Sequence, residues 1–505
     1  MPEHSPIWSE VHGHTPRPAL SADREVDVAI IGAGITGVTA ALLLRRAGKS
    51  VALLERNRAC DGVTGFTSAH VALQLDNRYN ELSSNLSSKE LRTLAQASRR
   101  AVSIIETLVR DESVECQFQR VPGFLYSNKS DEQKTLQDEV SLLQSLEFKA
   151  SYTRDVPLPY AVEGAVRLDD QAIFQPRAYT LRLLERALAV GVELYENTAV
   201  ESFHDGDPCT VETHDGPVVR ARNVIFAAHS PLKGVNLQNK LEHFNSYVIA
   251  FPASGDVTPS LICDTDDPYH YIRTFTLRGR PYWIVGGEDH RTGQEKDTNA
   301  PYERLIAWSS ERFKMTPEQV AFRWSSEVFE SVDGLPHIGQ MPGAKKIWLA
   351  TGFGGNGLTW GSLSAEMLTD AILGRESPYA DLFKAGRAVP LADLPTAMRN
   401  GLNVAGCYLG DVLRLAETDG VDDVKPGEGR LVKHRGEIVA ARRDAHGKLT
   451  VLKAKCPHLG GLVQYNSAEQ TWDCPCHGSR FDANGKVISG PTVKGLDPVA
   501  VEGKG

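Results

Sequence analysis

Long hydrophobic runs are missing from this 505-residue chain. No stretch reaches the roughly 18 to 20 apolar residues that a membrane-spanning helix needs, and the segment from Met1 to Leu20 has no apolar signal core. Basic residues are in the minority, since 55 Lys and Arg accompany 64 Asp and Glu and the net charge is −9. This balance argues against nucleic acid or an anionic membrane as the main partner. We therefore expect a cytoplasmic protein with no nucleic-acid partner and no membrane partner.

Cysteine is scarce, with eight in the whole chain, and most of these residues are dispersed. Their spacing shows no disulfide framework, so we expect the dispersed cysteines to be small buried side chains. They are Cys60, Cys116, Cys209, Cys263 and Cys407. The other three lie in two short segments that also contain histidine.

The first of these segments, Cys456–Gly461, reads Cys-Pro-His-Leu-Gly-Gly, and the second, Cys474–Ser479, reads Cys-Pro-Cys-His-Gly-Ser. Each offers a thiolate and an imidazole. Two Cys and two His divided in this way suit a [2Fe–2S] cluster in which sulfur holds one iron and nitrogen holds the other. A structural zinc site uses the same residue types and is the alternative, although zinc sites usually pair like ligands within one segment.

The spacing and the flanking glycines closely resemble a Rieske centre, over a stretch from about Thr418 to the end of the chain. The resemblance implies that Cys456 and Cys474 bind one iron and that His458 and His477 bind the other.

Two departures from high-potential Rieske proteins bear on the reduction potential. Those proteins carry a Cys where this chain has Gly461, so Cys476 lacks the disulfide partner that the resemblance would give it. They also carry a Tyr where this chain has Phe481, whereas Ser479, a donor to a bridging sulfide, is kept. Fewer donors to sulfur stabilise the reduced cluster less. We expect a potential in the lower or middle part of the Rieske range of roughly −150 to +300 mV.

A dinucleotide-binding pattern lies near the start of the sequence. The segment Val26 to Ile31 reads as a buried strand, Gly32 to Gly37 reads Gly-Ala-Gly-Ile-Thr-Gly, and Val38 to Gly48 reads as an apolar helix. A second strand from Val51 ends at the acid Glu55. The glycines allow close approach of a pyrophosphate to the helix N-terminus, and the acid suits a ribose 2′-hydroxyl. The predicted contacts are Gly32, Gly34, Ile35, Thr36, Gly37, Glu55 and Arg56.

Later segments favour FAD over NAD. They are Gly62 to Ala69, Asp333 to Gly339, and the glycine-rich run Ile347 to Gly361, which leads into a predicted helix from Ser362 to Leu373. Their order closely resembles the D-amino-acid oxidase superfamily of flavoproteins, from about Val26 to Leu382. The resemblance implies noncovalent FAD, because Phe66 and a Cys-free stretch, Trp324 to Phe329, stand where some relatives attach the flavin. It also implies FAD contacts at Thr64, Thr67 and Ser68, at Val200 on the adenine side, and, near the flavin ring, at Gly352, Gly354, Gly355, Gly357 and Leu358.

These resemblances imply an α/β fold: a Rossmann-like FAD-binding domain with an antiparallel-sheet substrate domain, followed by an all-β Rieske domain. We expect the FAD-binding domain at 22–80, 160–235 and 325–385, and the substrate domain at 81–159 and 236–324. A linker with a helix from Leu402 to Leu415 is expected at 386–417, and the Rieske domain at 418–505. Helices are also predicted from Lys89 to Val109, which carries an apolar stripe, and from Asp131 to Leu146.

The superfamily resemblance implies oxidation of an amine or amino acid at its C–N bond by hydride transfer to flavin. Pocket candidates are Arg273, Tyr271 and His290, with Tyr247 and Tyr269 beside them. A guanidinium at Arg273 could grip a substrate carboxylate; a surface ion pair is the alternative. For His290 the alternative is a structural loop histidine.

Three functions remain open at this point. The first is a dehydrogenase that passes electrons between FAD and the cluster to a soluble electron-transfer protein. The second is an O₂-using oxidase with a structural Rieske domain, and the third is a redox carrier or sensor without turnover. A Rieske oxygenase is disfavoured, because the sequence offers no convincing site of two His and one carboxylate for a mononuclear iron.

Overall fold

A computed structural model describes residues 4–500, except 11–12, 231–236, 238–239, 256, 391–392, 395, 397, 401–402, 404–405 and 407–419. The chain divides into two compact units. The first comprises Met1–His229, Ser246–Asp289 and Tyr302–Ala388, and the second comprises Ser230–Asn245, His290–Pro301 and Val389–Gly505. The domain limits expected from the sequence are finer than this division and stay predictions.

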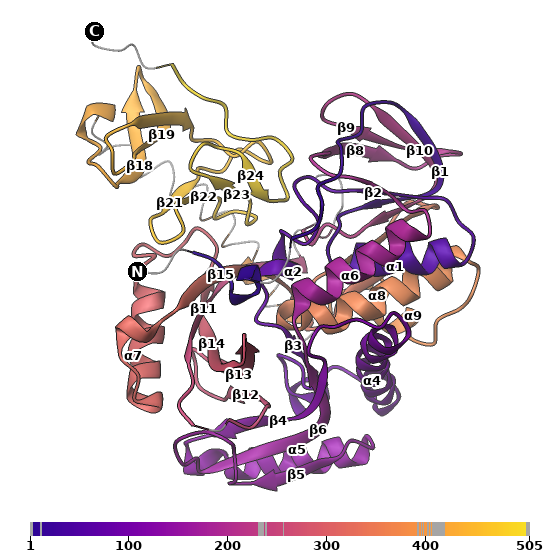
Figure 1. Ribbon diagram of the computed structural model, residues 1–505, viewed down its shortest axis with the longest axis vertical. Coiled ribbons are helices and arrows are strands. Elements are labelled where there is room, and N and C mark those ends of the chain that lie inside the picture. Colours follow the sequence, from indigo (N-terminus) through magenta and orange to yellow (C-terminus); the bar gives the residue numbers. More distant parts are fainter. Residues whose placement is uncertain are drawn as a thin grey trace. The chain divides into compact units, whose positions relative to one another are not determined.

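The first unit contains an eight-stranded sheet whose middle strands run parallel (Figure 1). Strand β1 (Arg24–Ile31) lies between β10 and β2, and its last four residues are buried, as expected for a strand covered on both faces. The strand order is β16 (His337–Gln340), β17 (Ile347–Thr351), β10 (Val218–Phe226), β1, β2 (Val51–Leu54) and β7 (Glu193–Tyr195), with β9 (Cys209–Thr213) on β10 and β8 (Val200–His204) on β9.

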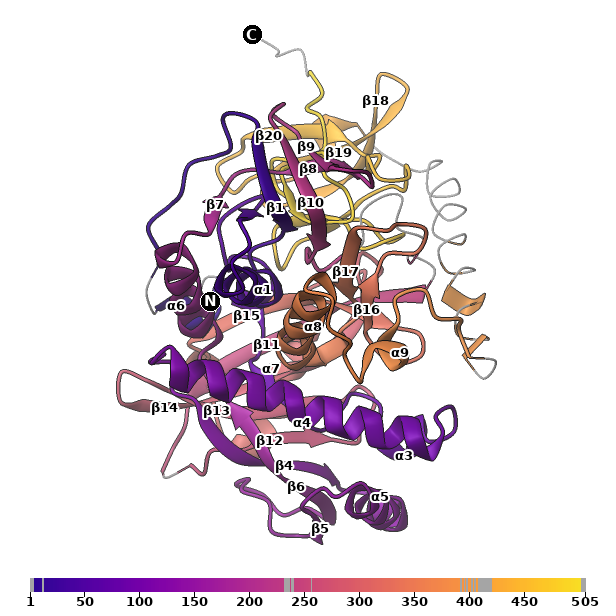
Figure 2. The same ribbon diagram turned by 90° about the vertical axis from the view of Figure 1, so that its right-hand side faces the viewer.

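Four helices form a row beside this sheet (Figures 1 and 2). Helix α1 (Ile35–Arg46) contacts α6 (Pro176–Ala189) and α8 (Gly357–Ile372), and α8 contacts α4 (Ser88–Asp111). Helix α4 begins with a capping box in which Ser87 and Glu90 satisfy each other's main-chain N–H. Shorter helices are α2 (Val63–Phe66), α3 (Tyr79–Leu82) and α9 (Ala380–Phe383).

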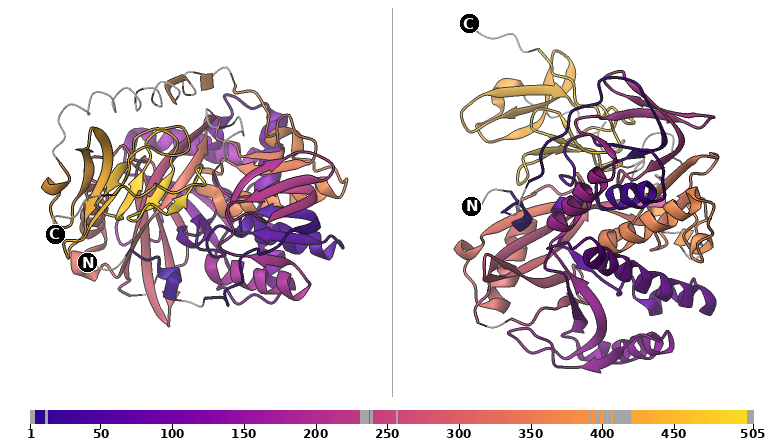
Figure 3. Two further views of the ribbon diagram at one scale, coloured as in Figure 1. Left: turned by 90° about the horizontal axis from the view of Figure 1, so that it is seen from above. Right: turned by 45° about the vertical axis from the view of Figure 1, so that its right-hand side comes forward.

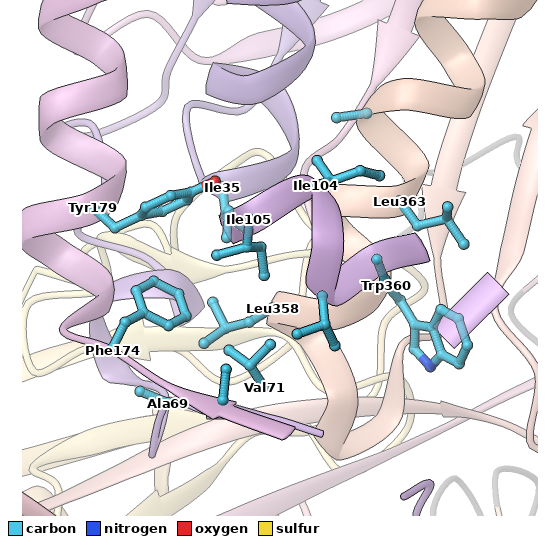
Figure 4. Close-up of a cluster of buried hydrophobic side chains, with 14 of the residues drawn as sticks. Ile35, Ala69, Val71, Ile104, Ile105, Phe174, Tyr179, Leu358, Trp360 and Leu363 are labelled. Carbon is cyan, nitrogen blue, oxygen red and sulfur yellow. The ribbon is translucent and has the colours of Figure 1, made fainter. Parts of the chain in front are cut away.

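Apolar side chains from these helices meet in one buried core (Figure 4). Ile35 of α1, Ile105 of α4 and Leu363 of α8 belong to it. Phe174 and Tyr179 pack edge to face beside them, with ring centroids 5.0 Å apart. The core therefore fixes α1 and α8, which both begin at a glycine-rich loop, in one rigid body.

A second, nine-stranded sheet carries the predicted pocket residues. Its order is β15 (Phe322–Ser331), β11 (Leu241–Pro252), β14 (Arg280–Arg291), β13 (His270–Leu277), β12 (Leu261–Asp264), β4 (Gln119–Ser127), β6 (Gly164–Ile173) and β3 (His70–Val71), with β5 (Ala150–Thr153) on β6. Strands β13 and β14 form a hairpin in which Tyr271 faces Gly286. Its two turn residues, Arg278 and Gly279, both have positive φ, as a tight hairpin turn requires. Helices α5 (Gln133–Ser145) and α7 (Ala300–Phe313) accompany this sheet.

The C-terminal part of the second unit consists of short strands joined by loops (gold to yellow in Figure 3). Gly447 and Gly485 occupy turns with φ of +87° and +86°, which confirms the predicted hairpin turns. One sheet contains β18 (Gly429–His434), β19 (Glu437–Arg443) and β20 (Leu449–Lys453), and the other contains β21 (Gln464–Asn466), β22 (Thr471–Asp473), β23 (Arg480–Asp482) and β24 (Val487–Ser489).

The predicted α/β fold class is confirmed by these sheets and helices, and the predicted helices appear as α4 and α5. Helix α8 begins at Gly357, earlier than the predicted Ser362, because the end of the glycine-rich run is already helical. The helix expected from Leu402 to Leu415 falls almost entirely outside the described residues. None of the described helices combines the length and apolar character needed to cross a bilayer.

The dispersed cysteines largely follow the prediction. Cys60, Cys116 and Cys209 are buried, whereas Cys263 is only partly buried. Cys407 lies outside the described residues.

Candidate cofactor sites and active site

The first glycine-rich loop joins β1 to the N-terminus of α1. A Cβ at Gly37 would lie 1.9 Å from the Gly32 carbonyl oxygen, so only glycine allows this approach of the helix to the loop. The cap residue Gly34 provides no side-chain hydrogen bond to the first turn of α1. Main-chain N–H groups at this helix end can therefore bind an anionic pyrophosphate.

Glu55 follows β2, at the position expected for the ribose-binding acid. Its carboxylate accepts hydrogen bonds from the N–H of Ala33 and of Asn57, each at 2.9 Å. Burial raises the pKa of Glu55, and these two N–H groups oppose the rise. Burial also lowers the pKa of the neighbouring Arg56, against the charge of Glu55.

Of the residues predicted after Glu55, Thr64 contacts this loop directly. Thr64 Oγ1 accepts the Ile35 N–H at 3.1 Å, and so it lies at the first turn of α1 beside Thr36. Thr67 Oγ1 accepts the Ala69 N–H at 3.1 Å, and Ser68 Oγ lies 3.0 Å from His70 Nδ1. Val200 is buried at the start of β8.

Residues near the start of the chain also contribute to this region, which sequence patterns did not indicate. The Trp8 indole N–H donates to the Thr67 carbonyl oxygen at 2.7 Å. His14 Nε2 lies 2.6 Å from the fully buried Glu196, whose carboxylate also accepts the Ala59 N–H. A tryptophan and a histidine in a polar segment carry no motif that could have placed them here.

The second glycine-rich loop leads into α8. Gly352 and Gly354 have φ of +72° and +56°, a region that favours glycine. Asp76 Oδ2 accepts the Gly355 N–H at 2.6 Å and its Oδ1 accepts the Asn356 side-chain N–H at 3.1 Å. The loop and Asp76 line a small hollow.

Two of the predicted flavin contacts belong to the first turn of α8. They are Gly357 and Leu358. The Leu358 side chain is buried in the core (Figure 4), so a contact with flavin there would come from the main chain. Sequence analysis missed Asp76, since an isolated acid in a loop has no recognisable pattern.

The four predicted cluster ligands come together in the second unit as two pairs. Cys456 lies beside Cys474. The hydrogen bond with the Cys474 thiol is the larger cause, and burial the smaller, of a raised pKa of Cys456, as expected of two neighbouring thiols. The rings of His458 and His477 are perpendicular, with centroids 4.9 Å apart. Among the described residues, no three His, Cys, Asp or Glu side chains are grouped around one metal position. Paired donors suit the two irons of a [2Fe–2S] cluster.

The residues next to the ligands agree with the predicted departures. Ser479 is fully buried, and its hydroxyl lowers the pKa of Cys456 by hydrogen bonding. A Cβ at Gly461 would lie 2.4 Å from Cys476 Sγ, so the two positions that carry a disulfide in high-potential Rieske proteins are adjacent here. Phe481 is buried in the same apolar cluster as Cys456.

Two segments that are distant in the sequence also belong to the second unit, where they contact residues in and near the second cluster segment. The Gln294 side chain donates to the Pro475 carbonyl oxygen at 3.3 Å. Thr298 Oγ1 lies 3.0 Å from Ser467 Oγ. Buried His243 adjoins this segment as well, because a hydrogen bond with the Cys476 main chain opposes the lowering of its pKa by burial. Residues 240–245 and 290–301 thus help to enclose the predicted cluster site.

Four of the five predicted active-site residues separate into three groups. Tyr271 on β13 and Tyr269, directly before that strand, lie together, with ring centroids 6.1 Å apart. Tyr247 is fully buried and packs against Tyr302 instead, with centroids 4.8 Å apart. His290 belongs to the second unit, where its Nδ1 lies 2.9 Å from the Arg291 carbonyl oxygen.

Arg273 requires a correction. Its guanidinium is 1% exposed and donates to the main-chain carbonyl oxygens of Ala69, Phe174 and Thr274. It is therefore neither a surface ion pair nor placed to grip a substrate carboxylate. The alternation of side chains along β13 could not reveal this, because the acceptors come from other parts of the chain.

Comparison with known proteins identifies the larger domain. Residues 27–371 match the DAO family model, described as FAD dependent oxidoreductase. The chain belongs to this family of FAD-dependent oxidoreductases. Residues 416–500 match the Rieske [2Fe-2S] domain.

Several relatives of this FAD-dependent oxidoreductase are known. YhfW of Bacillus subtilis, whose name describes a Rieske 2Fe-2S iron-sulfur protein, is 30% identical over 488 residues, which is 96% of this chain and 95% of YhfW. Glycine oxidase of Pseudomonas aeruginosa is 25% identical over 370 residues, covering 70% of this chain and 98% of that enzyme. The structure of glycine oxidase from Geobacillus kaustophilus covers 72% of this chain and 100% of its own, with a TM-score of 0.62 and 16% identity. That likeness shows a shared fold.

The DAO domain therefore binds FAD, and the Rieske domain binds a [2Fe–2S] cluster. The residues present fit both groups. The uncapped start of α1 and the carboxylate of Glu55 suit the pyrophosphate and ribose of FAD. The paired thiols and paired imidazoles suit the two unlike irons. Which individual residues contact each cofactor stays a prediction.

Proposed function

We propose that this chain oxidises the C–N bond of a small amine or amino acid and exchanges the electrons with a soluble electron-transfer protein through its Rieske domain. The observation that supports this is the presence of a DAO-type FAD domain and a Rieske domain in one chain. Relatives named glycine oxidase and L-proline dehydrogenase support a substrate with a C–N bond.

When bound, FAD would supply an acceptor for a hydride from carbon, and the cluster would supply a one-electron carrier. The carbon–nitrogen double bond left on the substrate is hydrolysed by water. The chain's own residues position the substrate and hold charge. The first turn of α8 begins at the hollow beside Asp76, and its main-chain N–H groups can stabilise negative charge there.

The active-site side chains supply hydroxyl groups rather than a strong base. Ser246 Oγ lies 2.8 Å from the Tyr271 hydroxyl, and the Tyr269 hydroxyl donates to Asp289 Oδ2 at 2.9 Å. Burial raises the pKa of both tyrosines, so they stay neutral donors near neutral pH. Such groups can orient a substrate nitrogen for hydride transfer.

Anaerobic mixing of the holoprotein with amines, N-methyl amino acids and D-amino acids tests the proposal. We expect the absorbance of oxidised flavin to fall with at least one compound, followed by the electron paramagnetic resonance signal of a reduced Rieske cluster. The matched control is Cys474→Ala, in which flavin bleaching should persist without that signal.

Two results would contradict the proposal in different ways. Bleaching of the flavin while the cluster stays oxidised, with the flavin reoxidised once O₂ is admitted, would replace electron transfer with an O₂-using oxidase. Absence of bleaching with every compound would refute oxidation at a C–N bond.

A further inference from the structure

A group of acidic and aromatic side chains lies beside the second glycine-rich loop in the first unit. Tyr269, Tyr271 and Asp289 form its centre, joined by the hydrogen bond between Tyr269 and Asp289. His70 packs edge-on to Tyr271, with ring centroids 5.4 Å apart. Asp76, which accepts hydrogen bonds from the second glycine-rich loop, is close enough for its charge to raise the pKa of Tyr269.

An irregular backbone conformation within β14 accompanies this arrangement. A Cβ at Gly286 would lie 2.2 Å from the Tyr271 ring, so glycine lets that ring lie across β14. The next two residues, Gly287 and Glu288, have φ of +143° and +57°, which interrupts the alternation of side chains. Such an irregularity turns the following side chain, and Asp289 meets Tyr269 as a result.

The carboxylate of Asp289 can accept a further hydrogen bond from a ligand. Its Oδ1 is buried and has no hydrogen-bond partner in the described part of the chain, although Ser246 lies near enough to lower the pKa of the carboxyl group. A buried acceptor without a donor is costly, and a bound ammonium group would satisfy it.

Two side chains near this group could carry a positive charge, Arg273 and His70. Arg273 donates to main-chain carbonyl oxygens. Burial, followed by the charge of Arg273, lowers the pKa of His70 to about 3, so this ring is neutral near pH 7. The charges that raise the pKa of Asp289 are those of Asp76 and Glu288, so acids dominate the surroundings of this carboxylate.

We propose that Asp289, Tyr269 and Tyr271 bind the positively charged nitrogen of an amine, and that the substrates are amines without a carboxylate next to that nitrogen. This inference rests on the proposed C–N oxidation. A carboxylate forms strong hydrogen bonds with an ammonium group, and tyrosine faces attract cations. An α-amino acid would bring its own carboxylate toward Asp289 and Asp76, where like charges repel.

The proposal includes a pH dependence with a definite sign. Burial raises the pKa of Asp289 to about 6; the charges of Asp76 and Glu288 add to the rise, and Ser246 and Tyr269 oppose it. Asp289 is therefore ionised above about pH 6, and cation binding should weaken as the pH falls through this value. The other titratable groups that face it, Tyr269, Tyr271 and His70, are neutral across this range.

Two measurements on the holoprotein test the inference. The first adds tetramethylammonium or benzoate in separate titrations and follows the flavin absorbance spectrum. Tetramethylammonium has no free amine and so cannot be oxidised by hydride loss. The second compares anaerobic flavin bleaching by matched pairs, pyrrolidine with proline and butylamine with norvaline. We expect the cation to perturb the spectrum more than the anion, and each amine to bleach flavin faster than its amino acid.

Variants assign the effect to the proposed residues. Asp289→Asn should weaken tetramethylammonium binding roughly 10- to 100-fold and remove its dependence on pH near 6. Tyr269→Phe removes one hydroxyl from a side chain that is 38% exposed. It should weaken tetramethylammonium binding less, and it allows the test if Asp289→Asn does not fold. Asp267→Asn is the matched control, because Asp267 is exposed in the segment that precedes β13.

The outcomes separate this inference from the proposed function. Tighter binding of benzoate, faster bleaching by the amino acids, or unchanged cation binding in folded Asp289→Asn would overturn the inference. Bleaching by amino acids alone would leave C–N oxidation standing. Cation binding that depends on Asp289, without bleaching by any compound, would refute C–N oxidation and keep the cation site.

Discussion

The replacement Gly461→Cys should close a disulfide with Cys476 and thereby restore the cross-link of high-potential Rieske proteins. The Cβ built at Gly461 lies 3.4 Å from the Cys476 Cβ, close to the range of about 3.5–4.5 Å seen in disulfides. Gly461 does not have a positive φ, so cysteine can adopt its backbone conformation. Cys476 is itself buried in the thiol form.

The expected stabilisation follows from the loop that the bond closes. Residues 461 and 476 enclose a loop of about 15 residues, for which chain entropy predicts roughly 3 kcal/mol. In the loaded protein, Cys456 and Cys474 already tie the two segments together through iron. The full gain should therefore appear only after the cluster is removed, as a higher free energy of unfolding of the oxidised than of the reduced variant.

Thiol alkylation followed by mass spectrometry, together with denaturant unfolding of the cluster-free protein, provides the assay. The matched control is Gly461→Ser, whose side chain has a similar size and cannot form the bond. Its Cβ would lie 2.4 Å from Cys476 Sγ, and such overpacking costs about 1–3 kcal/mol. Full alkylation of both cysteines in oxidised Gly461→Cys, or equal stability of its oxidised and reduced forms, would refute the geometry.

Three further predictions concern the two cofactor sites. Glu55→Gln removes the charged acceptor at the predicted ribose position and should weaken FAD binding roughly 10- to 100-fold in equilibrium titrations; unchanged affinity would place the ribose elsewhere. Cys474→Ala should abolish the resonance signal of the reduced cluster while flavin absorbance remains, whereas loss of both cofactors would show that the two units fold interdependently. Phe481→Tyr adds a hydroxyl in the buried cluster beside Cys456 and should raise the reduction potential by roughly 40 mV, which corresponds to about 1 kcal/mol for one electron; a potential at the wild-type value would mean that the hydroxyl does not reach sulfur.

The cofactor domains were predictable because their motifs are local. Strand, glycine loop and helix follow one another from Val26 to Gly48, and each cluster segment carries its own two ligands. The conformation of such short motifs depends little on the rest of the fold. The family matches and the sheet topology agree with both.

The pocket was less predictable because its contacts join distant parts of the chain. Arg273 fits a strand pattern that faces a pocket, yet its donors are used by carbonyl oxygens about 100 and 200 positions away. Asp289 takes its position from positive φ angles at Gly287 and Glu288, and the second of these is unusual for a residue with a side chain. Periodicity describes regular strands and so says nothing about such a break.

The composition of the second unit has a consequence for biosynthesis. Its members 230–245 and 290–301 leave the ribosome well before residues 420–500, with which they share this unit. Gln294 and Thr298 therefore cannot form their hydrogen bonds until Pro475 and Ser467 have been synthesised. These contacts join residues that are far apart in the sequence. A chain cut after Ala388 would expose the surfaces that these early segments normally bury. Stronger chaperone binding to this fragment than to the full chain would show that these surfaces stay exposed until the C-terminal residues are present.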